Sequence, residues 1–197
     1  MRRPKRASRK LDDRIAFLQE FLKNPRQVAS IIPSSRFLER RVVELAEIDH
    51  ARTIVDLGAG TGGMTRAILD AMPTRAKLLS IEINQRFCDL LGRIEDARLI
   101  AHCGSAHELQ ETLALYDLPA PEVVISGIPF STINRPMGQR ILESISSVLT
   151  PGGRFVAYQL SRQVENLSRP FFGSAQVALE MLNIPPLRLY RWEKQPA

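Results

Sequence analysis

The chain has 197 residues, a hydrophobic share of 44% and a formal net charge of +6. This length and composition are typical of a single globular domain with a sizeable core. No apolar run approaches the roughly 20 residues that a membrane-spanning helix needs, and the basic N-terminus lacks the apolar stretch of a secretory signal. The cysteines, Cys88 and Cys103, indicate no disulfide framework, and neither they nor the histidines show metal-ligand spacing. We therefore expect a cytoplasmic protein without a metal site.

The excess positive charge lies at the N-terminus. Residues 1–10 carry six arginines and lysines and no acid, which equals the whole net charge. Clustered cations favour an anionic membrane surface or nucleic acid as partner. Residues 11–23 predict an amphipathic helix that either packs on the domain or lies in a lipid interface. We expect residues 1–50 to form a basic, amphipathic segment for membrane association or as a lid, and residues 51–197 to form the main domain.

The remainder of the chain alternates between strand and helix patterns. A helix from Phe37 to about Glu47 is predicted, with Ser34 or Ser35 as its N-cap. The predicted strands are Thr53–Leu57, Lys77–Ile83, Ala97–Cys103, Glu122–Ser126 and Gly153–Gln159, and the predicted helices lie near 63–71, 84–93, 106–115 and 136–149. Residues 184–192 predict a final edge strand entered through prolines. This order favours a mostly parallel sheet with helices on both faces.

The most informative stretch is the glycine-rich loop that follows the first predicted strand. Asp56-Leu57-Gly58-Ala59-Gly60-Thr61-Gly62 lies between the strand and a predicted helix, an arrangement that cradles a nucleotide-type ligand. Glu82 follows twenty residues after Gly62, at the end of the next strand, where an acid can accept hydrogen bonds from ribose hydroxyls. The same glycine pattern is also typical of dinucleotide-binding proteins, so a dinucleotide cofactor is the alternative interpretation. Asp56 argues against it, since an acid beside the loop repels a diphosphate and attracts an ammonium.

In this form the loop resembles motif I of class I S-adenosylmethionine (SAM) methyltransferases. The resemblance implies a Rossmann-like fold with a mostly parallel seven-stranded sheet and with SAM as cofactor. Ser105, after the third strand, fits a contact to adenine, and an N-cap of the next helix is its alternative role. The implied cofactor-binding residues are Asp56, Gly58, Ala59, Gly60, Gly62, Glu82, Ile83, Gly104, Ser105, Ala106 and Ser126.

The loop after the fourth strand bears on the methyl acceptor. Ser126-Gly127-Ile128-Pro129-Phe130 resembles the Asn-x-Pro-Tyr/Phe loop of adenine-N6 methyltransferases, with Gly127 at the Asn position. A flipped adenine therefore loses a hydrogen bond of on the order of 1 kcal/mol. The chain also ends without the helical domain with which ribosomal RNA adenine dimethylases hold RNA. Nucleic acid is thus an unfavoured partner.

A sister family fits more of the chain. The Ser126–Phe130 loop, the upstream Ile-Pro-Ser-Ser and the closing Leu-Asn-Ile-Pro-Pro segment together resemble the soluble bacterial phosphatidylethanolamine N-methyltransferases. The resemblance implies methylation of the ethanolamine headgroup towards phosphatidylcholine, by a cytoplasmic protein held peripherally at the inner face of the cell membrane. It also implies that the basic N-terminal helix docks on anionic lipid.

Site residues for this reaction follow as hypotheses. A neutral amine would attack the methyl group of SAM, with catalysis chiefly by positioning and desolvation. Phe130 and Tyr158 are candidates for an aromatic wall facing the amine, although Tyr158 also fits an ordinary core role. The predicted catalytic residues are Ser126, Gly127, Phe130 and Tyr158, and the predicted lipid-binding residues are Ser34, Ser35, Pro129, Phe130, Arg135 and Arg162. Plain surface roles for the two arginines stay open. The alternative functions are an RNA or DNA adenine-N6 methyltransferase and a catalytically silent SAM-binding or interaction module.

Overall fold

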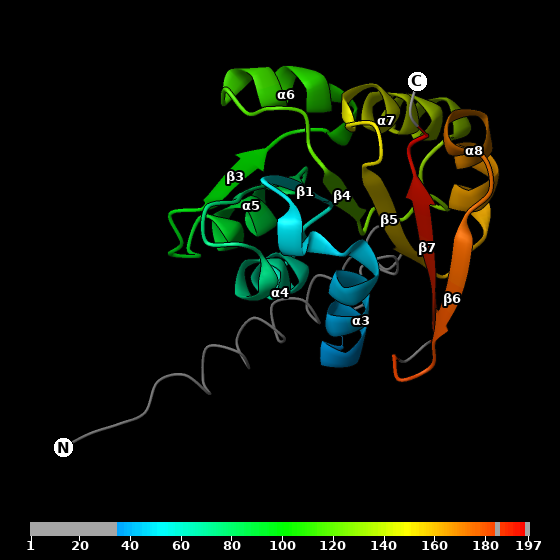
Figure 1. The fold of residues 1–197 in the computed structure, drawn as a ribbon, viewed down its shortest axis with the longest axis horizontal. Coiled ribbons are helices and arrows are strands. Elements are labelled where there is room, and N and C mark those ends of the chain that lie inside the picture. Colours follow the sequence, from blue (N-terminus) through cyan, green and yellow to red (C-terminus); the bar gives the residue numbers. More distant parts are fainter. Residues whose placement is uncertain (1–34, 184–185, 196–197) are drawn as a thin grey trace. The chain divides into compact units, whose positions relative to one another are not determined.

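The structure is a computed structural model that describes residues 35–183 and 186–195 (Figure 1). Its helices are α3 (Arg36–Ala46), α4 (Gly63–Ala71), α5 (Gln85–Leu91), α6 (Leu109–Leu115), α7 (Arg135–Val148) and α8 (Gln163–Phe172), with short 3-10 turns η1 (Ile48–His50) and η2 (Ala106–Glu108). Its strands are β1 (Thr53–Leu57), β2 (Lys77–Glu82), β3 (Leu99–Cys103), β4 (Val123–Ser126), β5 (Arg154–Gln159), β6 (Gln176–Glu180) and β7 (Leu187–Glu193).

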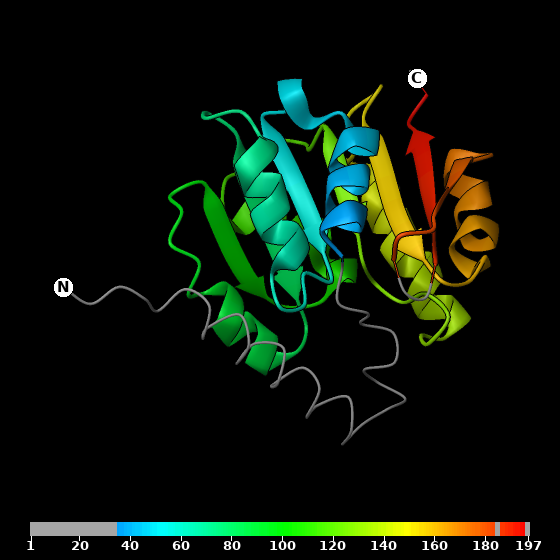
Figure 2. The ribbon, with the colours of Figure 1, turned by 90° about the horizontal axis from the view of Figure 1, so that it is seen from below.

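The strands form one seven-stranded sheet in the order β3-β2-β1-β4-β5-β7-β6. The first five are parallel, and β7 runs antiparallel between β5 and β6. Helices α3 and α4 cover one face, and α6, α7 and α8 cover the other (Figures 1 and 2). This arrangement confirms the Rossmann-like, mostly parallel fold that the sequence predicts.

Burial on both faces explains why the central strands are mostly apolar. Every residue of β1 and of β4 is buried, as expected for parallel strands that are sandwiched between helices. On the α6–α8 face the core contains Val55, Leu79 and Phe155, and Phe155 stacks on Trp192 with ring centroids 4.9 Å apart. The sheet is therefore a rigid platform whose strand ends position the loops.

Some predictions about elements are wrong. The predicted edge strand is β7, which pairs on both sides, because β6 adds to it as the actual edge strand. Neither β6 nor α8 was predicted from the pattern. Pro186 precedes β7, so it removes no hydrogen bond from the strand ladder.

The cysteines correct another expectation. Cys88 in α5 and Cys103 at the end of β3 form a disulfide, with Cα atoms 5.5 Å apart. The chain brings them together because α5 follows β2 directly and β3 is the parallel neighbour of β2.

Parts of the N-terminal hypothesis lie outside the described residues: the basic stretch 1–10, the predicted helix 11–23 and Ser34. The predicted helix near 37–47 is confirmed as α3. Within the described ranges, no helix is long and apolar enough to cross a membrane, and no group of three or more His, Cys, Asp or Glu side chains is placed to hold a metal ion.

Candidate active site

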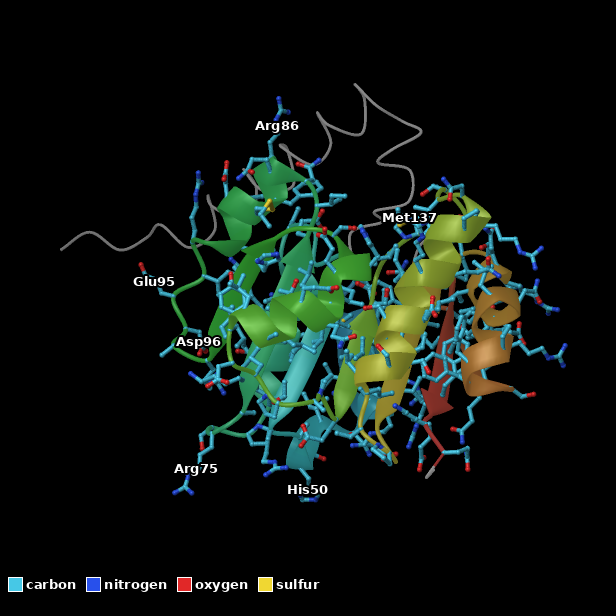
Figure 3. All side chains as sticks on the ribbon, turned by 90° about the horizontal axis from the view of Figure 1, so that it is seen from above. His50, Arg75, Arg86, Glu95, Asp96 and Met137 are labelled. Atoms are coloured by element: carbon cyan, nitrogen blue, oxygen red, sulfur yellow. A yellow bond between two sulfur atoms is a disulfide. The ribbon has the colours of Figure 1, made fainter. Side chains whose placement is uncertain are left out.

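The strand order reverses direction between β1 and β4, and the candidate residues follow these strands. Ligands of open α/β sheets bind at the carboxyl ends of the strands at such a switch point. Figure 3 marks this edge with Arg86 and Met137, near the starts of α5 and α7, and the opposite edge with His50 and Arg75. We call the first the carboxyl edge and the second the amino edge.

Positive φ angles shape the glycine loop after β1. Gly58, Gly60 and Gly62 have φ values of 73°, 56° and 81°, which other residues rarely adopt. The N–H of Gly58 donates to the carbonyl of Ile81 at 2.9 Å, so the loop turns across the end of β2. The backbone is therefore open to close approach by a ligand at this edge.

Glu82 holds the loop in this shape. Its carboxylate accepts a hydrogen bond from Gly60 N–H at 2.8 Å and from the N–H groups of Ile83 and Asn84 at 2.9 Å each. A carboxylate has about four acceptor sites, which leaves one direction for a ribose hydroxyl. Ile83 comes next and is exposed, so an apolar side chain adjoins this free acceptor direction, and its contact with the cofactor stays a prediction.

Asp56 is a buried carboxyl group with unmet hydrogen-bonding capacity. It is fully buried in β1, and its Oδ2 accepts a hydrogen bond from Thr65 Oγ1 at 2.7 Å, whereas its Oδ1 has no partner among the described residues. Burial, and to a smaller extent the nearby Glu82 charge, raise the pKa of Asp56 to about 7 against the lowering effect of the Thr65 hydrogen bond. A cationic ligand group near the loop would favour the ionised form, so these residues fit the amino-acid end of SAM.

The loop after β3 completes the cofactor side. Gly104 N–H donates to the carbonyl of Glu82 at 3.0 Å, and the Ser105 hydroxyl lies 2.6 Å from Nδ1 of His107 in a hydrogen bond. Ser105 makes no side-chain hydrogen bond that caps η2. The capping alternative is thus not observed, and the adenine contact stays a prediction.

The loop after β4 packs directly on the glycine loop. Gly127 N–H donates to the carbonyl of Leu57 at 2.9 Å, and the buried Ser126 hydroxyl accepts from Ile128 N–H at 3.3 Å. A Cβ on Gly58 would lie 3.0 Å from Cγ1 of Ile128. The predicted donor and acceptor loops are therefore in contact.

Tyr158 fills the space beside Gly127. The β4–β5 register pairs Ser126 with Ala157, which places Gly127 next to Tyr158. A Cβ on Gly127 would overlap the Tyr158 hydroxyl and lie 2.8 Å from its Cζ atom. The phenol therefore occupies the position in which an Asn side chain at residue 127 would begin.

Phe130 and Gln159 fix the rest of this loop. The Phe130 side chain is fully buried in the core, which gives it a packing role; its predicted contact with substrate stays a prediction. Gln159 accepts from Phe130 N–H at 3.3 Å and donates to the carbonyl of Ile128 at 2.7 Å, on either side of the half-buried Pro129. Gln159 was not predicted, and its only sequence signal is a polar residue that ends a buried strand.

The predicted lipid-binding residues are spread along the carboxyl edge. Arg135 begins α7 and Arg162 immediately precedes α8, and both are exposed. Ser35 caps α3 by accepting from Leu38 N–H at 3.1 Å, and its own N–H donates to Asn183 Oδ1 at 3.1 Å. Ser35 therefore belongs to the part of this edge near β6.

Comparisons with known proteins show which proteins the chain resembles. Residues 54–153 match the family model described as "Methyltransferase domain". The chain is similar to an ornithine lipid N-methyltransferase of Singulisphaera acidiphila, with 27% identity over 91% of this chain and 95% of that protein. It is also similar to a ribosomal RNA small subunit methyltransferase A of Phenylobacterium zucineum, with 26% identity over 62% of this chain and 40% of that protein.

A structural comparison supports the fold. Human N-acetylserotonin methyltransferase in complex with SAM has a TM-score of 0.62 and 13% identity, covering 80% of this chain and 52% of that one. The family match covers more than half of the 197 residues and includes the glycine loop, Glu82 and the Ser126–Phe130 loop. The chain therefore belongs to the methyltransferase domain family, and its cofactor is S-adenosylmethionine.

Proposed function

We propose that the protein methylates the amine headgroup of a membrane lipid, namely phosphatidylethanolamine and its mono- and dimethyl forms, towards phosphatidylcholine. The contact between Tyr158 and Gly127 carries this proposal, because the phenol of Tyr158 adjoins the acceptor loop in the place where an amide side chain at residue 127 would lie. A product that gains positive charge and loses N–H groups is better matched by an aromatic face than by fixed hydrogen-bond acceptors.

The relatives point in the same direction. The ornithine lipid N-methyltransferase aligns along nearly its whole length, whereas the ribosomal RNA methyltransferase aligns over a minority of its length. The basic residues 1–10 and the predicted amphipathic helix 11–23 support an anionic membrane surface, at the inner face of the cell membrane, as the place of reaction.

The residues have distinct roles in this reaction. SAM, when bound, supplies a methyl group activated by its sulfonium. The glycine loop and Glu82 orient the cofactor, and the Ser126–Phe130 loop, held by Gln159, borders the approach of the amine. Tyr158 excludes water from one side and faces the growing positive charge. Arg135 or Arg162 holds the lipid phosphate, and the amine proton leaves to water or to that phosphate.

The runner-up function is methylation of an adenine in RNA or DNA. It rests on the likeness of the Ser126–Phe130 loop to the Asn-x-Pro-Tyr/Phe loop and on the ribosomal RNA methyltransferase relatives. An adenine amino group would find no amide acceptor at Gly127, because the phenol of Tyr158 occupies that space.

A lipid panel tests the proposal. The protein is incubated with methyl-labelled SAM and vesicles that contain phosphatidylethanolamine, its monomethyl or dimethyl form, or an ornithine lipid, with phosphatidylglycerol vesicles as the control without amine. We expect label in the phosphatidylethanolamine series. Label in the ornithine lipid alone would show that the proposed ethanolamine headgroup is wrong. No label in any amine lipid would contradict the proposal as a whole.

A further inference from the structure

A set of exposed apolar side chains surrounds one part of the carboxyl edge. Phe37, Leu160, Met181 and Leu182 are 60%, 41%, 66% and 63% exposed. We call these four residues the apolar rim. Side chains of this kind are normally scattered over a surface, and a cluster at one edge indicates an interaction site.

Contacts place the apolar rim at one end of the sheet. Leu160 directly follows β5, and Met181 and Leu182 follow β6, which runs parallel to β5 because both are antiparallel to β7. Phe37 lies in the first turn of α3, whose capping residue Ser35 donates to Asn183. Arg188 of β7, the strand between β5 and β6, donates a hydrogen bond to the carbonyl of Leu160 at 3.0 Å.

The apolar rim adjoins the acceptor loop. Gln159, the neighbour of Leu160, is the residue that hydrogen-bonds the backbone of Ile128 and Phe130. A surface that contacts the apolar rim therefore lies beside the opening through which the methyl acceptor enters.

Two exposed arginines lie next to the apolar rim. Arg36 and Arg162 lie at the starts of α3 and α8, at the carboxyl edge, and within residues 35–183 and 186–195 neither forms an ion pair. At the amino edge, Glu47 pairs with Arg154 at 2.9 Å and with Arg191, and Arg52 pairs with Glu122 at 3.3 Å. Unpaired cations next to exposed apolar groups are typical of a lipid interface.

We infer that the apolar rim, with Arg36 and Arg162, is a docking surface for an anionic phospholipid bilayer and holds the acceptor opening against the headgroups. This inference rests on the proposed lipid acceptor, because a headgroup anchored in a bilayer reaches the site only if this edge faces the membrane. The apolar side chains enter the acyl boundary, and the two arginines lie at the level of the phosphates.

Vesicle binding by the full chain tests the inference independently of catalysis. The vesicles contain phosphatidylglycerol in phosphatidylcholine and no amine lipid, so binding is measured without methyl transfer. We expect the double variant Met181→Ser/Leu182→Ser to bind at least about tenfold more weakly, since both side chains lose their apolar burial in the acyl boundary. Arg36→Glu/Arg162→Glu should also weaken vesicle binding, and the loss should be larger at low salt than at high salt.

Leu115→Ser is the matched control, because Leu115 is 68% exposed at the end of α6 and away from the apolar rim. SAM affinity, measured on each variant, confirms folding. Wild-type vesicle binding by Met181→Ser/Leu182→Ser would overturn the inference. So would conversion of a dimer to a monomer by this variant with vesicle binding unchanged, because a second copy of the chain would then be the occupant. If the wild-type protein methylated no lipid but Met181→Ser/Leu182→Ser still lost vesicle binding, the proposed function would be wrong and the docking surface would be supported.

Discussion

At the residue scale, two local conflicts mark the site. Asp56 is a carboxyl group buried without full hydrogen bonding, and any side chain at Gly127 would have to displace the Tyr158 phenol. Neither arrangement is required by the fold alone, since other apolar or small residues would pack in the same sheet. Both conflicts lie next to the glycine loop, where a cofactor and an acceptor must meet.

Replacing Asp56 by asparagine should flatten the pH dependence of stability of the cofactor-free protein. The unfolded carboxyl group ionises near 3.8, whereas burial keeps the folded one protonated up to about pH 7. Between these values the native state binds more protons than the unfolded state. The free energy of unfolding therefore falls as pH rises, by up to about 1.4 kcal/mol per pH unit.

Urea denaturation between pH 5 and pH 8 measures this slope. Asp70→Asn, at an exposed position on α4, is the control and should keep the wild-type slope. If Asp56→Asn had the same slope as the wild type, the assignment of the pH dependence to Asp56 would be wrong.

Gly127 and Tyr158 should behave as one unit in a double-mutant cycle. Gly127→Ala displaces the phenol and Tyr158→Ala removes it, so each should lower methyl transfer by about tenfold or more, that is by about 1.4 kcal/mol. In the Tyr158→Ala background, Gly127→Ala should cost little further. Gly92→Ala is the control, because a Cβ at Gly92 meets its neighbours at an ordinary 3.5 Å. Additive losses would show that the two residues act independently.

At the element scale, the sequence predicts what local patterns determine. The predicted bounds of β1 are those observed, and β2 ends one residue earlier than predicted, because buried parallel strands are continuous apolar runs between turn residues. β6 escaped prediction because it is a short edge strand whose Val177 and Leu179 are exposed. α8 contains Pro170 within its last turn, which obscures the helical pattern.

The site, too, has a part that local sequence patterns predict and a part that they do not. The glycine loop and Glu82 are predictable, since they follow from spacing along the chain. The contacts of Gln159 with residues 128 and 130, and of Tyr158 with Gly127, join separate strands and depend on the β4–β5 register. No local pattern carries that information.

The disulfide couples two elements that flank the cofactor side. Cys88 and Cys103 are 15 residues apart in sequence, and the model of loop-closure entropy gives about 3 kcal/mol for a loop of this size. Reduction should therefore lower the free energy of unfolding by about 2–3 kcal/mol, measured by urea denaturation with and without reductant. The variant Cys88→Ser/Cys103→Ser should be insensitive to reductant. No effect of reductant on the wild type would show that the bond is absent in solution.

At the scale of the whole molecule, the two ends of the sheet have different surfaces. The carboxyl edge combines the cofactor loops, the acceptor loop and the apolar rim, whereas the ion pairs of Glu47 and Glu122 lie at the amino edge. Such an asymmetry suits an enzyme whose cofactor comes from water and whose acceptor lies in a membrane. The methyltransferase fold explains the donor side, and we propose that the carboxyl edge near β5 and β6 faces the acceptor.

One competition experiment tests the central claim most directly. The protein is mixed with labelled SAM, vesicles of phosphatidylethanolamine with phosphatidylglycerol, and ribosomal RNA in a single reaction, and the lipid and RNA fractions are separated and counted. The account predicts label in methylated phosphatidylethanolamine, none in RNA, and a lipid signal about tenfold weaker or more in Tyr158→Ala. Label in RNA with an unlabelled lipid fraction would contradict it.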